Sequence, residues 1–311
     1  MAQGTYHFPR GFLWGTATAS HQVEGKNTNN NWWQWEQESG RIKDGARSGL
    51  ACDWWGGRWR EDLDRAAEHG QNAHRLSIEW SRVQPAAGRW DEDALDYYRQ
   101  IVRGVVERGM TPLVTLHHFS DPLWFTEMGG WTGKDASALF EPYVAKVIEA
   151  LKEYVSLWVT INEPNVFAVS GYLFGDFPPG LTNPAKARRV MINLVRAHAA
   201  AYHTIHDIQT TARVGLAHNY HCMKPRSSSS LLDRWAASMG RHIFNDLIPG
   251  GCSSGVMRFP VWHSRIPQAR NTQDFLGLNY YTRELISLDL LKPGQAFVRR
   301  SHHDEDQLSD C

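Results

Sequence analysis

Residues 158–165, W-V-T-I-N-E-P-N, end a nearly continuous apolar run with an amide, a carboxylate and a proline. Proline favours an extended residue before it and cannot donate to a β-ladder, so a strand is expected to end with Glu163 at its rim. A carboxyl group held there is suited to moving a proton, and it is equally suited to a salt bridge or a helix N-cap. The position of Glu163 alone therefore leaves catalysis and a structural role equally open.

Strands and helices are expected to alternate along the chain around this segment. Continuous apolar runs, typical of a parallel sheet covered on both faces, predict strands at residues 12–19, 72–78, 111–117, 155–161, 213–219 and 274–280. Apolar residues at helical spacing predict helices at residues 59–70, 91–108, 134–154, 184–208 and 231–247. Asp91 is a suitable N-cap, and Pro142 is expected to restart the helix over 134–154 because proline suits a first turn better than an interior.

Both doubly wound sheets and (β/α)8 barrels contain this alternation. No Gly-x-Gly-x-x-Gly segment or phosphate-binding loop follows a strand, which argues against a nucleotide-binding sheet. Polar side chains follow the strands instead, namely Gln22, Arg75, His118, Glu163, Asn219 and Asn279. The carboxyl ends of barrel strands converge on one site, so the sequence predicts an α/β fold of the (β/α)8 TIM-barrel type.

The expected barrel is incomplete, with about six of the eight βα units in a single domain over residues 1–311. Beyond Tyr281, the short apolar run at 285–290 could form a hairpin strand. The remainder of 285–311 is polar, so this tail is expected to be loop-like or poorly ordered.

Composition excludes several classes of function. Lys plus Arg and Asp plus Glu are equal at 33 each, so neither nucleic acid nor an anionic membrane is an expected partner. No apolar run approaches the roughly 20 residues of a membrane helix, and the first ten residues lack a signal-peptide pattern, so we expect a cytoplasmic location. The four cysteines are scattered and the histidines lack H-E-x-x-H spacing, so we expect no metal and no cofactor. The 14 tryptophans fit either a large core or a carbohydrate site.

Five segments, in order along the chain, resemble the motifs of the β-glucosidase family of retaining glycoside hydrolases, family one. They are F-L-W-G-T-A-T-A-S-H-Q-V-E-G (12–25), H-R-L-S-I-E-W-S-R (74–82), T-L-H-H-F (115–119), T-I-N-E-P (160–164) and D-F-L-G-L-N-Y-Y (274–281). The resemblance runs from about residue 6 to residue 283. It implies a TIM barrel that hydrolyses β-linked glucosides or galactosides with retention of configuration.

The resemblance also implies roles for the residues around the reacting bond. Glu163 would protonate the leaving oxygen and then, as base, activate water. Arg75 and Tyr281 would orient a second carboxylate, the nucleophile, and Asn279 would support that cluster. Each also fits an ordinary role, Arg75 in a core ion pair and Tyr281 in packing.

The sugar itself would be bound by a further set of residues. Gln22 and His118 would hydrogen-bond hydroxyls of the cleaved sugar, unless they are satisfied interior polar groups, and Asn162 would bond the 2-hydroxyl. Trp124 and Phe174 are candidates for the side of the leaving group. Other polar residues in or next to the motifs are expected to be structural: His117, Glu79 as a neighbour of Arg75, and Glu24 and Asp121 as rim or loop charges.

The family carries its nucleophile in an I/V-T-E-N-G motif on the seventh strand. After Glu163 the only glutamates are Glu284 and Glu305, and neither follows Thr and precedes Asn-Gly. The family's Trp-containing eighth-strand segment is absent too. The sequence is therefore expected to stop before the seventh strand, with the nucleophile missing and open barrel edges that favour association. The alternatives to a hydrolase are a catalytically impaired relic, a sugar-binding module, or a partial barrel that assembles with itself or a complementary chain.

Overall fold

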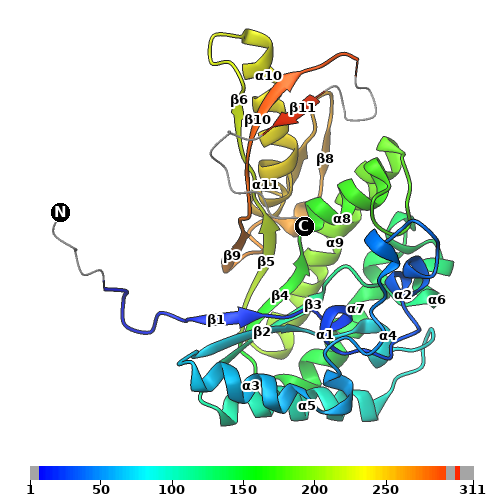
Figure 1. Ribbon diagram of the computed structural model, residues 1–311, viewed down its shortest axis with the longest axis vertical. Coiled ribbons are helices and arrows are strands. Elements are labelled where there is room, and N and C mark those ends of the chain that lie inside the picture. The colour runs from blue at the N-terminus through cyan, green and yellow to red at the C-terminus, as the bar shows by residue number, and fades with distance from the viewer. Residues whose placement is uncertain (1–6, 292–297, 302–311) are drawn as a thin grey trace.

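The computed structural model describes residues 7–291 and 298–301 (Figure 1). Its main sheet has six strands in chain order: β1 (Gly15–Ala17), β2 (Ala73–Ser77), β3 (Thr111–His117), β4 (Leu157–Asn162), β5 (Arg213–Asn219) and β9 (Phe275–Asn279). Every neighbouring pair is parallel. A doubly wound sheet reverses its strand order at a switch point, whereas this order never reverses. The sheet curls in Figure 1 from β1 and β2 toward β5 and β9, as part of a barrel wall does.

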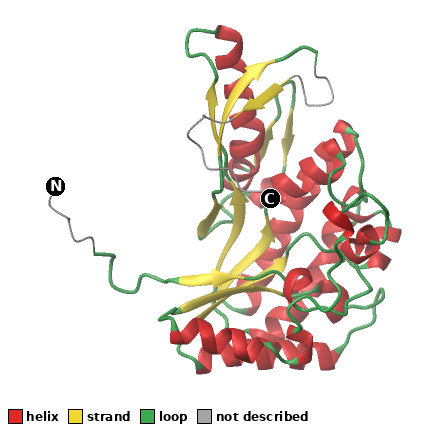
Figure 2. Ribbon diagram, in the orientation of Figure 1, coloured by secondary structure: helices red, strands yellow, loops and turns green. Residues whose placement is uncertain are grey.

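Helices connect the successive strands. Those before β5 lie below and to the right of the main sheet in Figure 2, and those between β5 and β9 lie in the upper part of the figure. The connecting helices are α3 (Trp59–Glu68), α5 (Glu92–Glu107), α7 (Ala136–Leu151), α9 (Pro184–Ile208), α10 (Leu231–Arg241) and α11 (Leu247–Ser254). Short helices follow the carboxyl ends of four strands: α1 (Ser20–Val23), α2 (Asn31–Glu36), α4 (Trp80–Val83), α6 (Leu123–Glu127) and α8 (Pro164–Val169). Single turns of 3-10 or π helix complete the connections: η1 (Lys43–Gly45), η2 (Trp54–Gly56), η3 (Gly130–Thr132), η4 (Ser170–Phe174), η5 (His242–Asp246) and η6 (Pro267–Ala269).

The local signals explain most helix boundaries, with one exception in α7. The Asp91 side chain caps α5 by accepting the backbone N–H of Ala94 at 2.9 Å, as predicted. The expected restart at Pro142 is wrong, because α7 continues through it as one helix. Pro142 removes one backbone hydrogen bond, but Tyr143 and Val144 beside it are fully buried. Packing of this face outweighs the local preference of proline.

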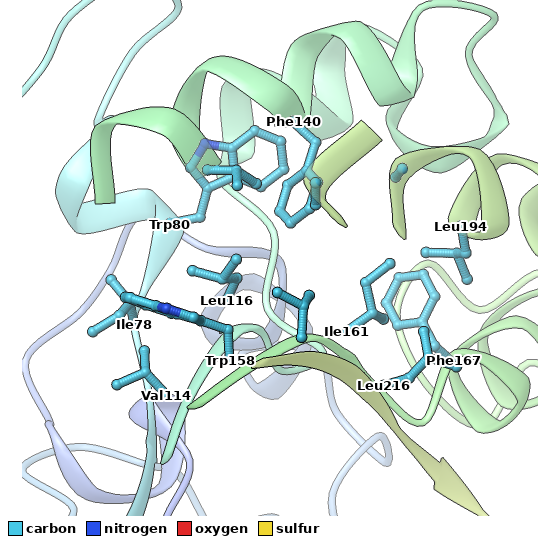
Figure 3. Packing of buried hydrophobic residues seen from close by; sticks show 14 of the residues in the cluster. Ile78, Trp80, Val114, Leu116, Phe140, Trp158, Ile161, Phe167, Leu194 and Leu216 are labelled. Carbon is cyan, nitrogen blue, oxygen red and sulfur yellow. The ribbon is translucent and has the colours of Figure 1, made fainter. Parts of the chain in front are cut away.

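The hydrophobic core lies between the sheet and its helices (Figure 3). Apolar side chains of the strands meet those of the helices, and the figure labels Ile78, Trp80, Val114, Leu116, Phe140, Trp158, Ile161, Phe167, Leu194 and Leu216. Trp80, Trp131 and Trp158 are among the largest fully buried side chains. Part of the high tryptophan content therefore serves the core.

The two outer strands of the main sheet expose apolar groups. β1 was expected as a buried strand over 12–19, but it is three residues long and exposed, since β2 is its one partner. Next to it, the rings of Phe8, Phe12 and Trp14 pack together with centroids 4.6–4.8 Å apart and remain exposed. On β9 the alternate residues Leu276 and Leu278 are exposed as well.

Two small sheets lie beside the main one. β10 (Arg283–Leu288) pairs in parallel with β6 (Cys222–Pro225) and antiparallel with β11 (Val298–Ser301), and β7 (Val256–Arg258) pairs antiparallel with β8 (His263–Arg265). The hairpin strand expected at 285–290 is confirmed, because β10 covers most of it and pairs antiparallel with β11. β11 itself lies in the part of 285–311 that was expected to be loop-like. Residues 292–297 and 302–311 of that tail lie outside the described residues.

Candidate active site

Four of the predicted site residues meet at the carboxyl ends of three strands. Nη2 of Arg75, from β2, donates to Oδ1 of Asn162 at the end of β4, at 2.7 Å. The amide nitrogen of Asn279, at the end of β9, donates to the same oxygen at 3.2 Å and to Oε1 of Glu163 at 2.6 Å. Nε of Arg75 donates to Oγ1 of Thr115 on β3 at 2.9 Å. The cluster therefore links residues that are far apart in the sequence.

The backbone at the end of β4 places Glu163 with unusual precision. The register of β4 against β5 shifts between Val159 and Asn162, an irregularity of the kind that re-aims side chains beside active sites. Glu163 has a φ of 46°, a left-handed conformation that costs a non-glycine residue about 1 kcal/mol or more. Its N–H donates to the Ala217 carbonyl at 2.6 Å, and Pro164 begins α8 directly after it. The backbone of Glu163 is thus fixed, and the residue is only 6% exposed.

The orientation of the Asn162 and Asn279 side-chain amides follows from which of the neighbouring atoms can donate a hydrogen bond and which can accept one. A guanidinium group can only donate, so Asn162 must turn its oxygen toward Arg75, and its amide nitrogen is left to donate elsewhere. Asn279 must present its nitrogen, because both of its partners here are oxygen acceptors. Asn162 therefore has two N–H donors that this network does not use.

The charges of the cluster influence one another. Burial lowers the pKa of the Arg75 guanidinium, while the nearby Tyr281 and Glu163 raise it and so favour its charged form. Tyr281 lies just beyond β9 and is 74% exposed. The pKa of its hydroxyl is raised first by partial burial and then by the charge of Glu163. Arg75, Tyr281 and Glu163 are thus close enough to interact electrostatically.

The two predicted contacts to sugar hydroxyls, His118 and Gln22, lie at the ends of β3 and β1. His118 is half-buried, and burial, with the Arg75 charge, lowers its pKa to about 3, so its imidazole is neutral at ordinary pH. Its Nδ1 is buried and has no hydrogen-bond partner among the described residues. Gln22 lies on α1 and is exposed. Both side chains can therefore exchange hydrogen bonds with an added polar molecule.

The two candidates for the leaving-group side, Trp124 and Phe174, contact other residues than this cluster. Trp124 on α6 donates its Nε1–H to the Gln84 carbonyl at 2.8 Å and meets Trp80 edge-on at 5.6 Å. Phe174 lines an apolar cavity of about 330 Å³ whose walls include Met223 on β6 and Ile286 on β10. Neither ring shares a hydrogen bond or ring contact with Glu163 in the described part of the chain.

Two charges expected at the rim are buried instead. Glu24 is 3% exposed, accepts from Arg82 Nε at 2.6 Å and Tyr98 hydroxyl at 2.7 Å, and burial raises its pKa to about 7. Asp121 accepts from the Trp131 indole N–H at 2.8 Å, and its Oδ1 lies 2.9 Å from His117 Nε2. The signal available in the sequence was the position of Glu24 inside a motif segment and of Asp121 two residues after another, which places both near strand ends. The structural role expected for His117 agrees with its contact.

A comparison with known protein families decides the relationship of the chain. The model of glycosyl hydrolase family 1 matches residues 4–307. The chain belongs to glycosyl hydrolase family 1.

The relatives of this family 1 chain are longer than it is. β-Glucosidase A of Thermotoga maritima is 32% identical over 313 residues, which cover 94% of this chain and 70% of that protein. Human cytosolic β-glucosidase is 29% identical, with coverage of 93% of this chain and 68% of that protein.

Solved structures of the same family have the same fold. A β-glycosidase from Pyrococcus horikoshii superposes with a TM-score of 0.88 at 40% identity, covering 97% of this chain and 68% of that chain. The Thermotoga maritima β-glucosidase in complex with deoxynojirimycin superposes with a TM-score of 0.88 at 31% identity, covering 96% of this chain and 70% of that chain.

In the part of the chain that the structure describes, no group of three or more His, Cys, Asp or Glu side chains is arranged to hold a metal ion. Within residues 7–291 and 298–301, no helix has the length and apolar character needed to cross a membrane.

Proposed function

We propose that this family 1 chain takes part in the hydrolysis of β-linked glucosides or galactosides with retention of configuration, and that Glu163 is the general acid and base. The observation that carries the proposal is the hydrogen bond from Asn279 to Oε1 of Glu163, which leaves Oε2 to carry the transferred proton. In the first step Glu163 protonates the leaving oxygen, and in the second it takes a proton from water.

The sugar would be held by the donors that the cluster leaves unused. The amide nitrogen of Asn162 would donate to the 2-hydroxyl, a contact that strengthens as positive charge develops on the sugar ring. Neutral His118 would bond a second hydroxyl through its buried, unpaired Nδ1, and Gln22 a third. Trp124 and Phe174 would contact the leaving group. Phe174 has the stronger support, because it lines an apolar cavity.

A retaining mechanism also requires a second carboxyl group about 5 Å from the first. The sequence contains no Thr-Glu-Asn-Gly segment. Glu284 is a poor substitute, since it is buried on β10 with His221 Nδ1 at 3.5 Å and Arg300 Nη1 at 3.7 Å. This chain then contributes the acid and base together with Arg75 and Tyr281, which would orient the second carboxylate.

An assay with a matched variant tests the proposal. 4-Nitrophenyl β-D-glucoside and its galactoside isomer are incubated with the chain and with Glu163→Gln, which keeps the shape of the side chain and removes its acidity. Turnover that is lost in the variant supports the proposal, whereas equal background rates in both chains contradict it. A 2-fluoroglucoside trap followed by mass spectrometry then identifies any carboxylate that becomes glycosylated.

The second candidate is sugar binding without hydrolysis. It is favoured by the unused amide N–H donors of Asn162 and the unpaired Nδ1 of His118, which could hold a sugar without any proton transfer. Calorimetric binding of deoxynojirimycin, combined with no turnover of the aryl glucoside, would favour this candidate over the hydrolase.

We further propose that the main sheet represents six of the eight βα units of a TIM barrel and that residues 1–311 form one domain. The exposed apolar side chains beside β1 and on β9 support association through these two edges, with a second copy or a complementary chain. A partial barrel whose role is assembly would show the same association.

A further inference from the structure

Glu79 is completely buried, and its side-chain oxygens accept hydrogen bonds from four side chains. It lies between β2 and α4 and is 0% exposed. Its Oε2 accepts the hydroxyls of Ser20 and Ser120, each at 2.7 Å. Its Oε1 accepts the hydroxyl of Ser81 at 2.7 Å and the amide nitrogen of Asn30 at 3.3 Å. One side chain thereby connects the segments that follow β1, β2 and β3.

These contacts are directional and costly to break. A carboxylate accepts only, so each serine must turn its hydroxyl proton toward Glu79. Each donor meets a Glu79 oxygen that is buried away from water, and breaking the bond would leave buried polar atoms unsatisfied, so each donor is held in place. Glu79 and the four side chains that donate to it are called the hub below. The backbone N–H of Glu79 donates to the Tyr98 hydroxyl at 3.0 Å, which holds Glu79 itself in place. Ser20, Ser81 and Ser120 are all buried as well.

Two of the three serines lie beside the residues proposed to bind the sugar. Ser20 begins α1, and Gln22 is two residues later on the same short helix. Ser120 comes two residues after His118, and the residue between them, Phe119, has a φ of 71°. A non-glycine residue keeps this left-handed conformation only when its surroundings hold it. Besides the Ser120 hydroxyl, the Trp32 indole N–H holds this turn, by donating to the Phe119 carbonyl at 3.2 Å.

We propose that Glu79 is a positioning residue. It fixes the position of α1 relative to the turn after β3, so that Gln22 and His118 can bind the same sugar. This inference rests on the proposed function for the roles of these two side chains. Ser81 serves as an internal reference, because its hydroxyl makes an equally short bond to Glu79 but its segment carries no proposed sugar contact.

The test compares three single-atom deletions, Ser20→Ala, Ser120→Ala and Ser81→Ala, in the full chain. Each removes one hydroxyl from the hub without adding bulk. Ser81→Ala also removes the acceptor of the Asn27 amide N–H at 2.8 Å, so it should cost at least as much unfolding free energy in urea as the other two. Backbone hydrogen exchange followed by mass spectrometry, without ligand, reports the positions of the segments. We expect faster exchange in residues 19–24 for Ser20→Ala and in residues 117–122 for Ser120→Ala. Unchanged exchange there, or the same increase in Ser81→Ala, would overturn the inference.

A binding measurement adds a readout that general loss of stability does not change. For deoxynojirimycin we expect affinity to fall about 5- to 10-fold in Ser20→Ala and Ser120→Ala and less than about twofold in Ser81→Ala. Equal losses in all three variants would overturn the inference. Gln22→Ala and His118→Ala test the sugar site separately. If these two leave affinity unchanged, the proposed sugar contacts fail, while hydrogen exchange still decides the role of Glu79.

Discussion

The amide nitrogen of Asn279 lies 2.6 Å from Oε1 of Glu163, although 116 positions separate the two residues in the chain. In the sheet, β5 lies between β4, which precedes Glu163, and β9, which ends at Asn279. The two side chains therefore reach across the end of β5 to form this bond. The same nitrogen bonds Asn162, so one amide orients both residues proposed to face the sugar.

Replacing Asn279 with alanine should disturb both of these residues. Asn279→Ala leaves the buried carboxyl of Glu163 without this donor, which should lower the unfolding free energy by about 1–3 kcal/mol. Urea denaturation measures the change. The control is Leu278→Ala on the same strand, whose side chain is exposed and should cost less. Similar losses of unfolding free energy in the two variants would show that the hydrogen bonds of Asn279 add no stability beyond that of an exposed side chain.

Arg75 should not tolerate replacement by lysine. Its guanidinium donates to Thr115 and Asn162 at once, and an ammonium group cannot match both directions. Arg75→Lys should lower stability by about 1–3 kcal/mol and weaken deoxynojirimycin binding by turning Asn162. Thr115→Val, which removes the Nε partner alone, should leave binding closer to normal. Wild-type affinity in Arg75→Lys would contradict the role given to this network.

Acid should destabilise the strand that carries Glu163 through His198, a buried residue of α9. Its Nε2 lies 2.7 Å from the Thr272 carbonyl and must donate, so Nδ1 accepts from the Thr160 hydroxyl at 2.6 Å. Burial lowers the His198 pKa from 6.5 to about 4. Between pH 6.5 and pH 4, His198 is protonated in the unfolded chain and neutral in the folded chain. The stability present above pH 6.5 is therefore lost as the pH falls toward 4.

This loss of unfolding free energy amounts to up to about 3 kcal/mol from one group. It is measured as the difference between the acid-induced losses of the wild-type chain and of a variant without the histidine. Unfolding free energies are measured at pH 7 and pH 4.5 for the chain and for His198→Gln, whose amide replaces the ring without titrating. The variant should lose less stability on acidification than the wild type. Parallel pH profiles would exclude His198 as a source of the acid sensitivity.

The exposed edge of β9 should drive association. Leu276→Lys with Leu278→Lys places two charges on that edge and should shift the chain toward the monomer in sedimentation velocity at several concentrations. Leu231→Lys is the control, because Leu231 is exposed on α10, outside the main sheet, and its replacement should leave association unchanged. A wild-type chain that is monomeric throughout would contradict association through these edges.

The sequence located the elements of this fold well, and the structure explains where it did not. The strands at 111–117 and 213–219 and the helix at 184–208 match the structure to the residue, because periodicity, caps and prolines agree there. Pro142 was misjudged because the burial of one face of α7, a tertiary effect, outweighs a local preference. β1 was expected to be buried because apolar residues do not reveal how many neighbours a strand has.

For the site, motif resemblance selected Arg75, Asn162, Glu163 and Asn279, which the structure joins in one hydrogen-bonded cluster. It did not reveal Thr115, whose hydroxyl holds Arg75, or the convergence of serines on Glu79. Such contacts depend on how loops from different strands fold over one another, and no spacing along the chain encodes that directly. Only three-dimensional packing shows which polar side chains meet.

The acid role of Glu163 is tested most directly by the dependence of hydrolysis on the leaving group. The chain and Glu163→Gln are compared on phenyl β-D-glucoside, whose leaving group needs protonation, and on 2,4-dinitrophenyl β-D-glucoside, whose leaving group does not. General acid catalysis typically contributes about 10²–10⁴-fold, so the variant should lose about that factor on the phenyl glucoside and far less on the dinitrophenyl glucoside. Equal loss factors on both substrates, or equal rates in the two chains, would contradict the assignment of Glu163 as the acid.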